Sequence, residues 1–193
     1  PPPPEEGKVI PFTLAVYPQE SFHPALSKNR TNLLLASLLY QPLYRLDERF
    51  EPQPVLASGA AASEDKLTWT ISLQNAAFSD GTPLTGKLAA DALNAARGEG
   101  SRYAARLAGI TGVAAGEGSV VITLSSPNGN LPALLDIPIA LGDGPRPLGT
   151  GPYVLREEET VLSLEAAEGQ AVPAKTIPLH AITQTDDLIA AFD

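Results

Sequence analysis

The chain has 193 residues, of which 44% are hydrophobic and 18% charged, with a formal net charge of −9 and no cysteine. This composition can bury a core and is not that of a disordered chain, while the absence of cysteine excludes disulfides and thiolate metal sites. The negative charge disfavours nucleic acid and anionic membranes as partners, because both would repel it.

The N-terminal residues 1–11 are predicted to form a proline-rich leader, since they begin with four prolines. Proline favours an extended polyproline II chain, which suits a linker or a tether. Residues 12–193 are expected to form the folded part. In it, residues 12–17 (FTLAVY) predict a buried strand. The leucine-rich stretch 32–40 predicts a buried helix with Thr31 as its N-cap.

The middle of the chain carries the clearest strand. Residues 67–73 (LTWTISL) alternate between apolar and polar, which predicts a strand whose Trp69 faces the core. A shorter strand is expected at 43–46. Thr85 is expected to cap a helix that runs to about Arg97, because the intervening residues are rich in alanine and leucine.

The remaining segments predict two hairpins and several short elements. The expected hairpin strands are 110–115 with 119–124 and 153–157 with 161–165; helical turns are expected at 101–107 and 131–135, a strand at 176–182 and a helix at 186–192. Strands paired in hairpins with helices between them indicate an α+β or mixed α/β fold: a mixed sheet with hairpins and flanking helices.

A search for catalytic chemistry finds no local motif. His23 and His180 are far apart and have no metal-ligand spacing, and no serine lies in a nucleophile motif. The glycine-rich loop 142–151 lacks the lysine of a phosphate-binding loop, and its prolines remove backbone donors. We therefore expect no catalytic residue, no metal site and no cofactor, although a pair of carboxylates from distant segments would leave no local signature.

Several motifs in order resemble those of a known family. They are FHP at 22–24, LYQPL at 39–43, EPQPVLA at 51–57, SEDKLTWTISL at 63–73, FSDGTPL at 78–84 and PLGTGPY at 147–153. The sequence thereby resembles the extracellular solute-binding proteins of the peptide and nickel ABC-transporter class, family 5. It departs from the family pattern after Thr85, where Gly86 to Ala89 replace Ala-Glu-Asp-Val.

The resemblance implies the N-terminal lobe of a periplasmic-binding-protein-like receptor, with the second lobe absent from this chain. Such a receptor binds peptides, a nickel complex or another small solute between two lobes and passes it to the permease subunits of an ABC importer. The implied location is extracytoplasmic, as a surface lipoprotein or in the periplasm. The membrane is then contacted only through an N-terminal anchor outside this chain.

The resemblance also implies which residues meet the ligand. The loop before the first long helix lines the cleft in peptide-binding relatives, and here it comprises Ser27, Lys28, Asn29, Arg30 and Thr31. Two other functions stay open at this point. One is a freestanding interaction or scaffold domain that no longer transports, and the other is an enzyme with a nonlocal carboxylate pair.

Overall fold

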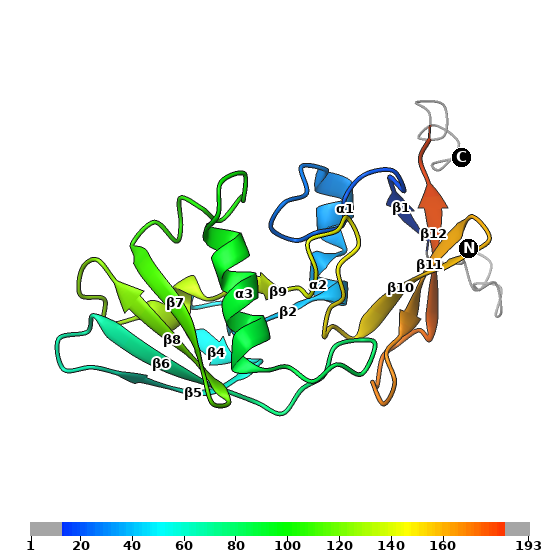
Figure 1. The fold of residues 1–193 in the computed structure, drawn as a ribbon. Coiled ribbons are helices and arrows are strands. Elements are labelled where there is room, and N and C mark those ends of the chain that lie inside the picture. Colours follow the sequence, from blue (N-terminus) through cyan, green and yellow to red (C-terminus); the bar gives the residue numbers. More distant parts are fainter. Residues whose placement is uncertain (1–12, 184–193) are drawn as a thin grey trace, which may run out of the picture.

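The molecule is built around two four-stranded sheets, each with its own hydrophobic core (Figure 1). The structure, a computed structural model, describes residues 13–183. The expected leader and the expected helix at 186–192 therefore lie outside the described residues. The α+β or mixed α/β class is confirmed, since helices alternate with antiparallel and parallel strand pairs.

The first sheet has the strand order β5-β6-β8-β7, with every neighbouring pair antiparallel. The alternating pattern that predicted β6 is confirmed, because Trp69 and Ile71 are buried. The indole N–H of Trp69 donates a hydrogen bond to the Asn128 carbonyl at 3.1 Å. The strands are β5 (Ala57–Ala62), β6 (Thr68–Leu73), β7 (Ile110–Gly116) and β8 (Ser119–Leu124).

Helix α3 (Gly86–Arg97) packs against β7 and β8 of this sheet. Its expected cap is confirmed, since the Thr85 side chain accepts a hydrogen bond from the Leu88 backbone N–H at 3.3 Å. A Cβ on Gly86 would overlap the carbonyl oxygens of Gly116 and Ser119. The departure from the family pattern at Gly86 thus lets the helix start close to the hairpin turn.

The second sheet has the order β1-β12-β11-β10 and joins the two ends of the described chain (Figure 1). Strand β1 pairs in parallel with β12, whereas β10 and β11 form the expected antiparallel hairpin. The expected strands 12–17 and 176–182 are confirmed over shorter spans. The strands are β1 (Leu14–Val16), β10 (Tyr153–Glu158), β11 (Val161–Ala166) and β12 (Thr176–Ala181).

Short elements connect the two sheets. The strand expected at 43–46 is confirmed, but its partner and a second strand pair were not predicted. These elements are β2 (Gln41–Pro42) paired with β9 (Pro138–Ile139), β3 (Tyr44–Leu46) paired with β4 (Pro52–Pro54), and the 3-10 helix η1 (Leu131–Leu134).

Two helix predictions need correction. The helix expected at 32–40 is two short helices, α1 (Arg30–Leu34) and α2 (Ala36–Leu39), because the Leu35 N–H bonds to the carbonyl three residues back and tightens the turn. The N-cap is Asn29 and not Thr31, since the Asn29 side chain accepts from the Asn32 N–H at 3.0 Å. The helical turns expected at 101–107 are present as successive hydrogen-bonded turns, including a bond from the Leu107 N–H to the Tyr103 carbonyl at 3.0 Å.

Among residues 13–183, no helix combines the length and the apolar character needed to cross a membrane.

Candidate ligand-binding surface

The segment 17–31, which joins β1 to α1, is held in place by one buried amide. The Oδ1 atom of Asn32 accepts a hydrogen bond from the Tyr17 N–H at 2.9 Å, and Nδ2 donates to the carbonyls of Tyr17 at 2.9 Å and Glu20 at 3.3 Å. Asn32 is 1% exposed, so these bonds replace water for every polar atom of its side chain. One residue thus fixes the exit of β1 and the start of the loop.

Further along the segment, side chains bond to nearby backbone groups. The Ser27 hydroxyl donates to the Ser21 carbonyl at 2.6 Å and accepts from the Asn29 N–H at 3.2 Å. The Nδ1 atom of His23 accepts from the Ala25 N–H at 3.1 Å. These bonds give the loop a defined shape although it contains no regular secondary structure.

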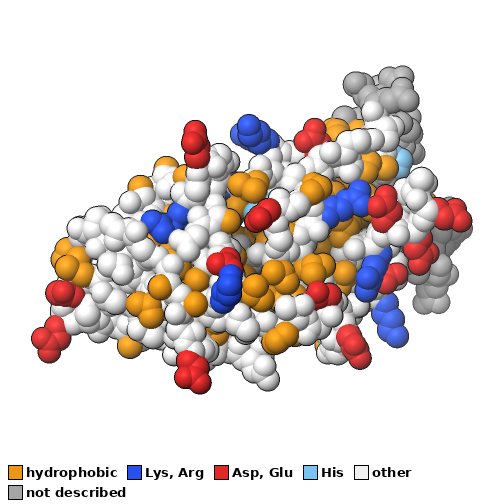
Figure 2. All heavy atoms as spheres, viewed as in Figure 1, with side chains coloured by type: hydrophobic (Ala, Val, Ile, Leu, Met, Phe, Trp, Pro, Cys, Tyr) orange, Lys and Arg blue, Asp and Glu red, His pale blue; other side chains and the backbone are white. Residues whose placement is uncertain are grey.

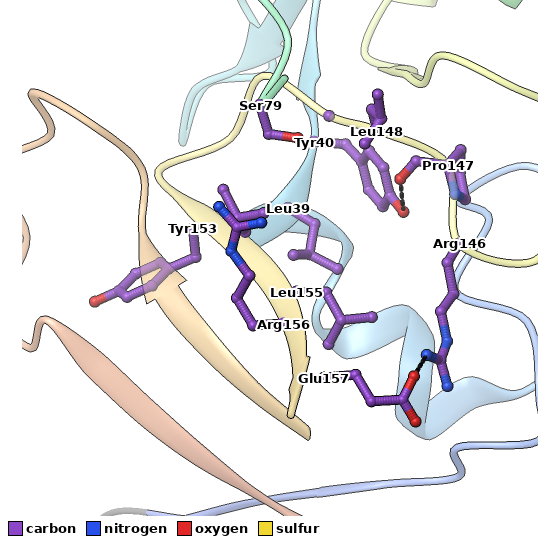
Figure 3. Close-up of a pocket in the computed structure, with 12 residues that line it drawn as sticks. Leu39, Tyr40, Ser79, Arg146, Pro147, Leu148, Tyr153, Leu155, Arg156 and Glu157 are labelled. Atoms are coloured by element: carbon purple, nitrogen blue, oxygen red, sulfur yellow. Dashed lines mark hydrogen bonds and ion pairs between the residues drawn. The ribbon is translucent and has the colours of Figure 1, made fainter. Parts of the chain in front are cut away.

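Arg146, in the glycine-rich segment 142–151, clamps the loop from the other side (Figure 3). Its guanidinium pairs with Glu157 on β10 and donates to the Pro18 carbonyl at 3.2 Å. It also lies 5.9 Å from the centre of the Phe22 ring. Because the Phe22 N–H donates to the Pro145 carbonyl at 2.7 Å, the two segments are joined through both backbone and side chain.

Beneath this clamp lies a small cavity of about 80 Å³ between residues 146–149 and β10. Figure 3 shows Tyr40 reaching across it, and its hydroxyl donates to the Pro147 carbonyl at 3.2 Å. Burial raises the pKa of Tyr40, so the hydroxyl stays protonated and remains a donor. The cavity is a small gap in the packing around Arg146 and β10, and it is too small for a peptide.

The five residues expected to meet a ligand lie together at the entry to α1, but in two different roles. Ser27 is buried and Asn29 caps α1, so both side chains are engaged within the loop. Lys28 and Arg30 are exposed, and Thr31 is half-buried. The structure therefore leaves two cationic side chains exposed, that of Lys28 on the loop and that of Arg30 in the first turn of α1.

A groove of about 440 Å³ opens beside this loop. Pro24 before the loop and Leu33 and Leu34 after it contribute an apolar wall, with Leu34 76% exposed. Arg102 and Arg106 from the turns after α3 also line the groove, and Arg45, Tyr103 and Asp136 complete its polar lining. The Arg102 N–H donates to the Ala25 carbonyl at 3.0 Å, which ties these turns to the loop.

The groove's arginines are oriented by the surrounding backbone and by an aromatic ring. Arg106 donates to the carbonyls of Ala133 at 2.8 Å and Asp136 at 3.3 Å. The guanidinium of Arg102 lies 5.7 Å from the centre of the Tyr103 ring. Burial is the main cause that raises the pKa of Tyr103, so its hydroxyl is neutral beside these charges.

A second cavity, of about 260 Å³, lies between the loop and α3. His23, Asp91 and Asp143 line it together with apolar residues of α3. Burial lowers the pKa of His23 from its ordinary 6.5, while the negative charge of Asp143 opposes the shift. The ring is therefore neutral near pH 7, as the hydrogen bonds accepted by Nδ1 require.

On the face shown in Figure 2, hydrophobic side chains gather toward the middle, and charged side chains lie mostly around them. Within residues 13–183, no three histidine, aspartate or glutamate side chains are grouped so that they could hold a metal ion. The exposed apolar and cationic groups can bind a ligand noncovalently.

Sequence reasoning missed two parts of this surface. Asn32 stood inside a leucine-rich stretch and was included in the helix, although a lone amide among leucines could have indicated a buried hydrogen-bonding role. Arg102 and Arg106 lie four residues apart in a segment with no strong pattern. Only the fold brings them to α1.

Comparison with known proteins gives one family and a consistent fold. The model described as bacterial extracellular solute-binding proteins, family 5 Middle, matches residues 51–192. A Brucella ovis protein, named as a candidate ABC transporter peptide-binding protein, is 35% identical over 122 residues, which are 61% of this chain and 22% of that protein.

Two solved structures share the fold along nearly the whole chain. MoaA of A. tumefaciens R10 in complex with mannopinic acid gives a TM-score of 0.75 at 20% identity, covering 94% of this chain and 42% of that one. NikZ of Campylobacter jejuni in complex with Ni(L-His) gives 0.70 at 21% identity, covering 93% and 41%. The fold expected from the resemblance is confirmed. The chain spans less than half the length of each of these three proteins.

Proposed function

The chain belongs to the bacterial extracellular solute-binding proteins of family 5, and we propose that it supplies one lobe of a receptor that delivers peptides to an ABC importer. The observation that carries the proposal is the family match over residues 51–192. The proposed location is extracytoplasmic, with attachment through an N-terminal lipid anchor. The family is one of solute-binding proteins, and we propose no catalytic role for this chain.

The binding surface we propose is the loop of Ser27, Lys28, Asn29, Arg30 and Thr31, together with the groove beside it. Ser27 and Asn29 hold the loop in shape through their hydrogen bonds. Lys28, Arg30 and Thr31 then present donors to an extended peptide, whose backbone carbonyls need partners when they leave water. The apolar wall of the groove takes up one peptide side chain.

In this mechanism a second lobe closes over the ligand and buries its other face. One lobe supplies only part of the contact area, whereas the entropic cost of holding the ligand is largely the same. The 193-residue chain alone should therefore bind much more weakly than a two-lobed protein. The permease would recognise the closed form.

The experiment is a calorimetric titration with a mixture of tripeptides and tetrapeptides. It compares the 193-residue chain with the protein expressed from its gene and freed of any signal sequence. We expect the gene product to bind at least tenfold more tightly than the chain if the gene encodes a second lobe. Equal affinity of the two would contradict the two-lobe account, and no binding by either would favour a scaffold domain.

A matched pair of variants tests the loop. Arg30→Gln should weaken peptide binding by the gene product several-fold, because a neutral amide replaces the outward-facing charged donor and the charge-assisted hydrogen bond is lost. Arg49→Gln removes an equally exposed arginine from the turn between β3 and β4 and should leave affinity unchanged. If both variants bind like the parent protein, Arg30 is an ordinary solvated side chain.

A further inference from the structure

The charge of the groove differs from that of the molecule around it. The whole chain is acidic, with 22 aspartate and glutamate residues against 13 lysine and arginine residues. The groove, however, is lined by Arg45, Arg102 and Arg106 and by a single carboxylate, that of Asp136. An anion that approaches this protein therefore meets a local excess of positive charge here.

The groove's arginines are also not neutralised by the described chain. Between residues 13 and 183, ion pairs join Lys87 to Asp91, Arg146 to Glu157 and Arg156 to Glu165. None of the three arginines of the groove takes part in such a pair with another described residue. Arg106 instead donates two hydrogen bonds to neutral backbone carbonyls. These bonds hold its guanidinium in place but leave its charge uncompensated.

The apolar wall adds a second requirement on the ligand. Leu33 and Leu34 of α1 line the groove together with the arginines on the turns after α3. A fitting ligand therefore has an anionic group next to a short apolar portion. A glutamate or aspartate side chain of a peptide has this form, and so does a peptide C-terminus beside an apolar side chain.

We propose that this groove binds a carboxylate of the ligand through Arg102 and Arg106, so that the receptor prefers carboxylate-bearing peptides. The inference rests on the proposed function and specifies its substrate class. A planar guanidinium matches the two oxygens of a carboxylate, and each charge-assisted hydrogen bond adds specificity against a neutral amide.

The test is a calorimetric titration of the gene product with the tripeptides Ala-Glu-Ala and Ala-Gln-Ala, each with a free and with an amidated C-terminus. We expect the carboxylate to improve binding about tenfold, and the preference to shrink in high salt because exposed charges are screened. Comparing glutamate with glutamine tests a side-chain carboxylate, and comparing the free with the amidated C-terminus tests the terminal carboxylate.

Three variants connect the preference to this groove. Arg102→Gln should abolish the discrimination between the charged and neutral peptides, while binding of the neutral peptide persists. Asp136→Asn removes the opposing carboxylate and should strengthen binding of the charged peptide several-fold. Arg49→Gln, outside the groove, should retain the full preference.

Three outcomes would overturn the inference. If neutral and acidic peptides bind equally, or if Arg102→Gln leaves the preference intact, the groove does not select carboxylates, although peptide binding itself stands. If no peptide binds at all, the proposed function and this inference fail together.

Discussion

At the residue scale, Asn32 determines the shape of the proposed binding loop. Its side chain contacts backbone groups of Tyr17 and Glu20, which are 15 and 12 residues earlier in the chain. Asn32→Ala should lower the free energy of unfolding by about 3 kcal/mol, because buried backbone groups lose their partners. Asn29→Ala removes only an N-cap and should cost about 1 kcal/mol.

Urea unfolding followed by circular dichroism would measure both variants. If both variants lose a similar free energy of unfolding, the Asn32 side chain contributes no more to stability than the N-cap of α1 does.

His23 gives the loop a dependence on pH. Its pKa in the folded protein lies below 6.5, so the unfolded chain binds more protons as the pH falls past that value. The contribution of His23 to stability is fully present above its ordinary pKa of 6.5 and is lost as the pH falls through its lowered pKa in the folded protein. Hydrogen bonds lower the pKa values of Asp47, Asp65 and Asp80 from their ordinary 3.8. Their contribution to stability is therefore lost only at more acidic pH, as the pH falls through these lowered values.

We expect the free energy of unfolding to fall as the pH is lowered below 6.5. In His23→Asn the slope should be smaller, because asparagine keeps an acceptor for the Ala25 N–H but does not titrate. Denaturant unfolding at several pH values gives both slopes. Identical slopes in parent and variant would assign the pH dependence to other groups.

At the scale of elements, the segment 145–151 depends on two glycines where it crosses the end of α2. A Cβ on Gly149 would overlap the Leu39 carbonyl oxygen and lie 2.6 Å from Tyr40 Cδ1, and one on Gly151 would overlap the Leu38 carbonyl oxygen. The Gly151 N–H donates to the Leu39 carbonyl at 3.0 Å. The glycines of the PLGTGPY motif therefore allow the backbone of this segment to lie directly against the backbone at the end of α2.

Gly149→Ala should cost about 3 kcal/mol of stability, since neither backbone segment can retreat without breaking this contact. Gly144→Ala is the matched control in the same segment, because nothing lies within 4 Å of its added Cβ. It should change stability by less than about 0.5 kcal/mol. Thermal or urea unfolding of the two variants distinguishes close packing from a general intolerance of alanine in the segment.

Elements with their own side-chain pattern were predictable from the sequence, and elements defined by distant partners were not. The alternation in 67–73 and the turn glycines at 116 and 118 predicted β6 and the β7–β8 hairpin. Strand β4 contains two prolines and β5 is a run of small residues, so neither has a strand pattern of its own. Both are strands because β3 and β6 supply hydrogen-bonding edges.

The same reasoning applies to the binding surface. Residues 27–31 could be named because they follow a family motif, and their exposure to a ligand stays a prediction. The groove arginines carry no local signal, since only the fold brings the turns after α3 to the groove that α1 also lines. A buried asparagine or an unpaired arginine is recognised by its contacts, which a single sequence does not contain.

At the scale of the whole molecule, the two cores differ in size. The core of the first sheet includes residues of α3, β6, β8 and η1, whereas that of the second sheet is a smaller cluster around Tyr40, Tyr153 and Leu164. Local stability rises with buried apolar contact. We expect amide protons of β6 and β8 to exchange more slowly than those of β10 and β11.

Hydrogen exchange with mass spectrometry can follow peptides from both sheets in one experiment. Equal protection of the two sheets would indicate that they open as a single cooperative unit. The expected order would instead show that the second sheet, which holds both ends of the described chain, opens first.

The position of Trp69 determines whether tryptophan fluorescence follows unfolding or ligand binding. It is the single tryptophan of the chain, 8% exposed in the first core, and it is absent from the lining of the groove. Its emission should shift to longer wavelength when the core unfolds and should change little when a peptide enters the groove. Tryptophan fluorescence is therefore a poor measure of peptide binding by this chain. It is a good measure of the rate at which the first core folds.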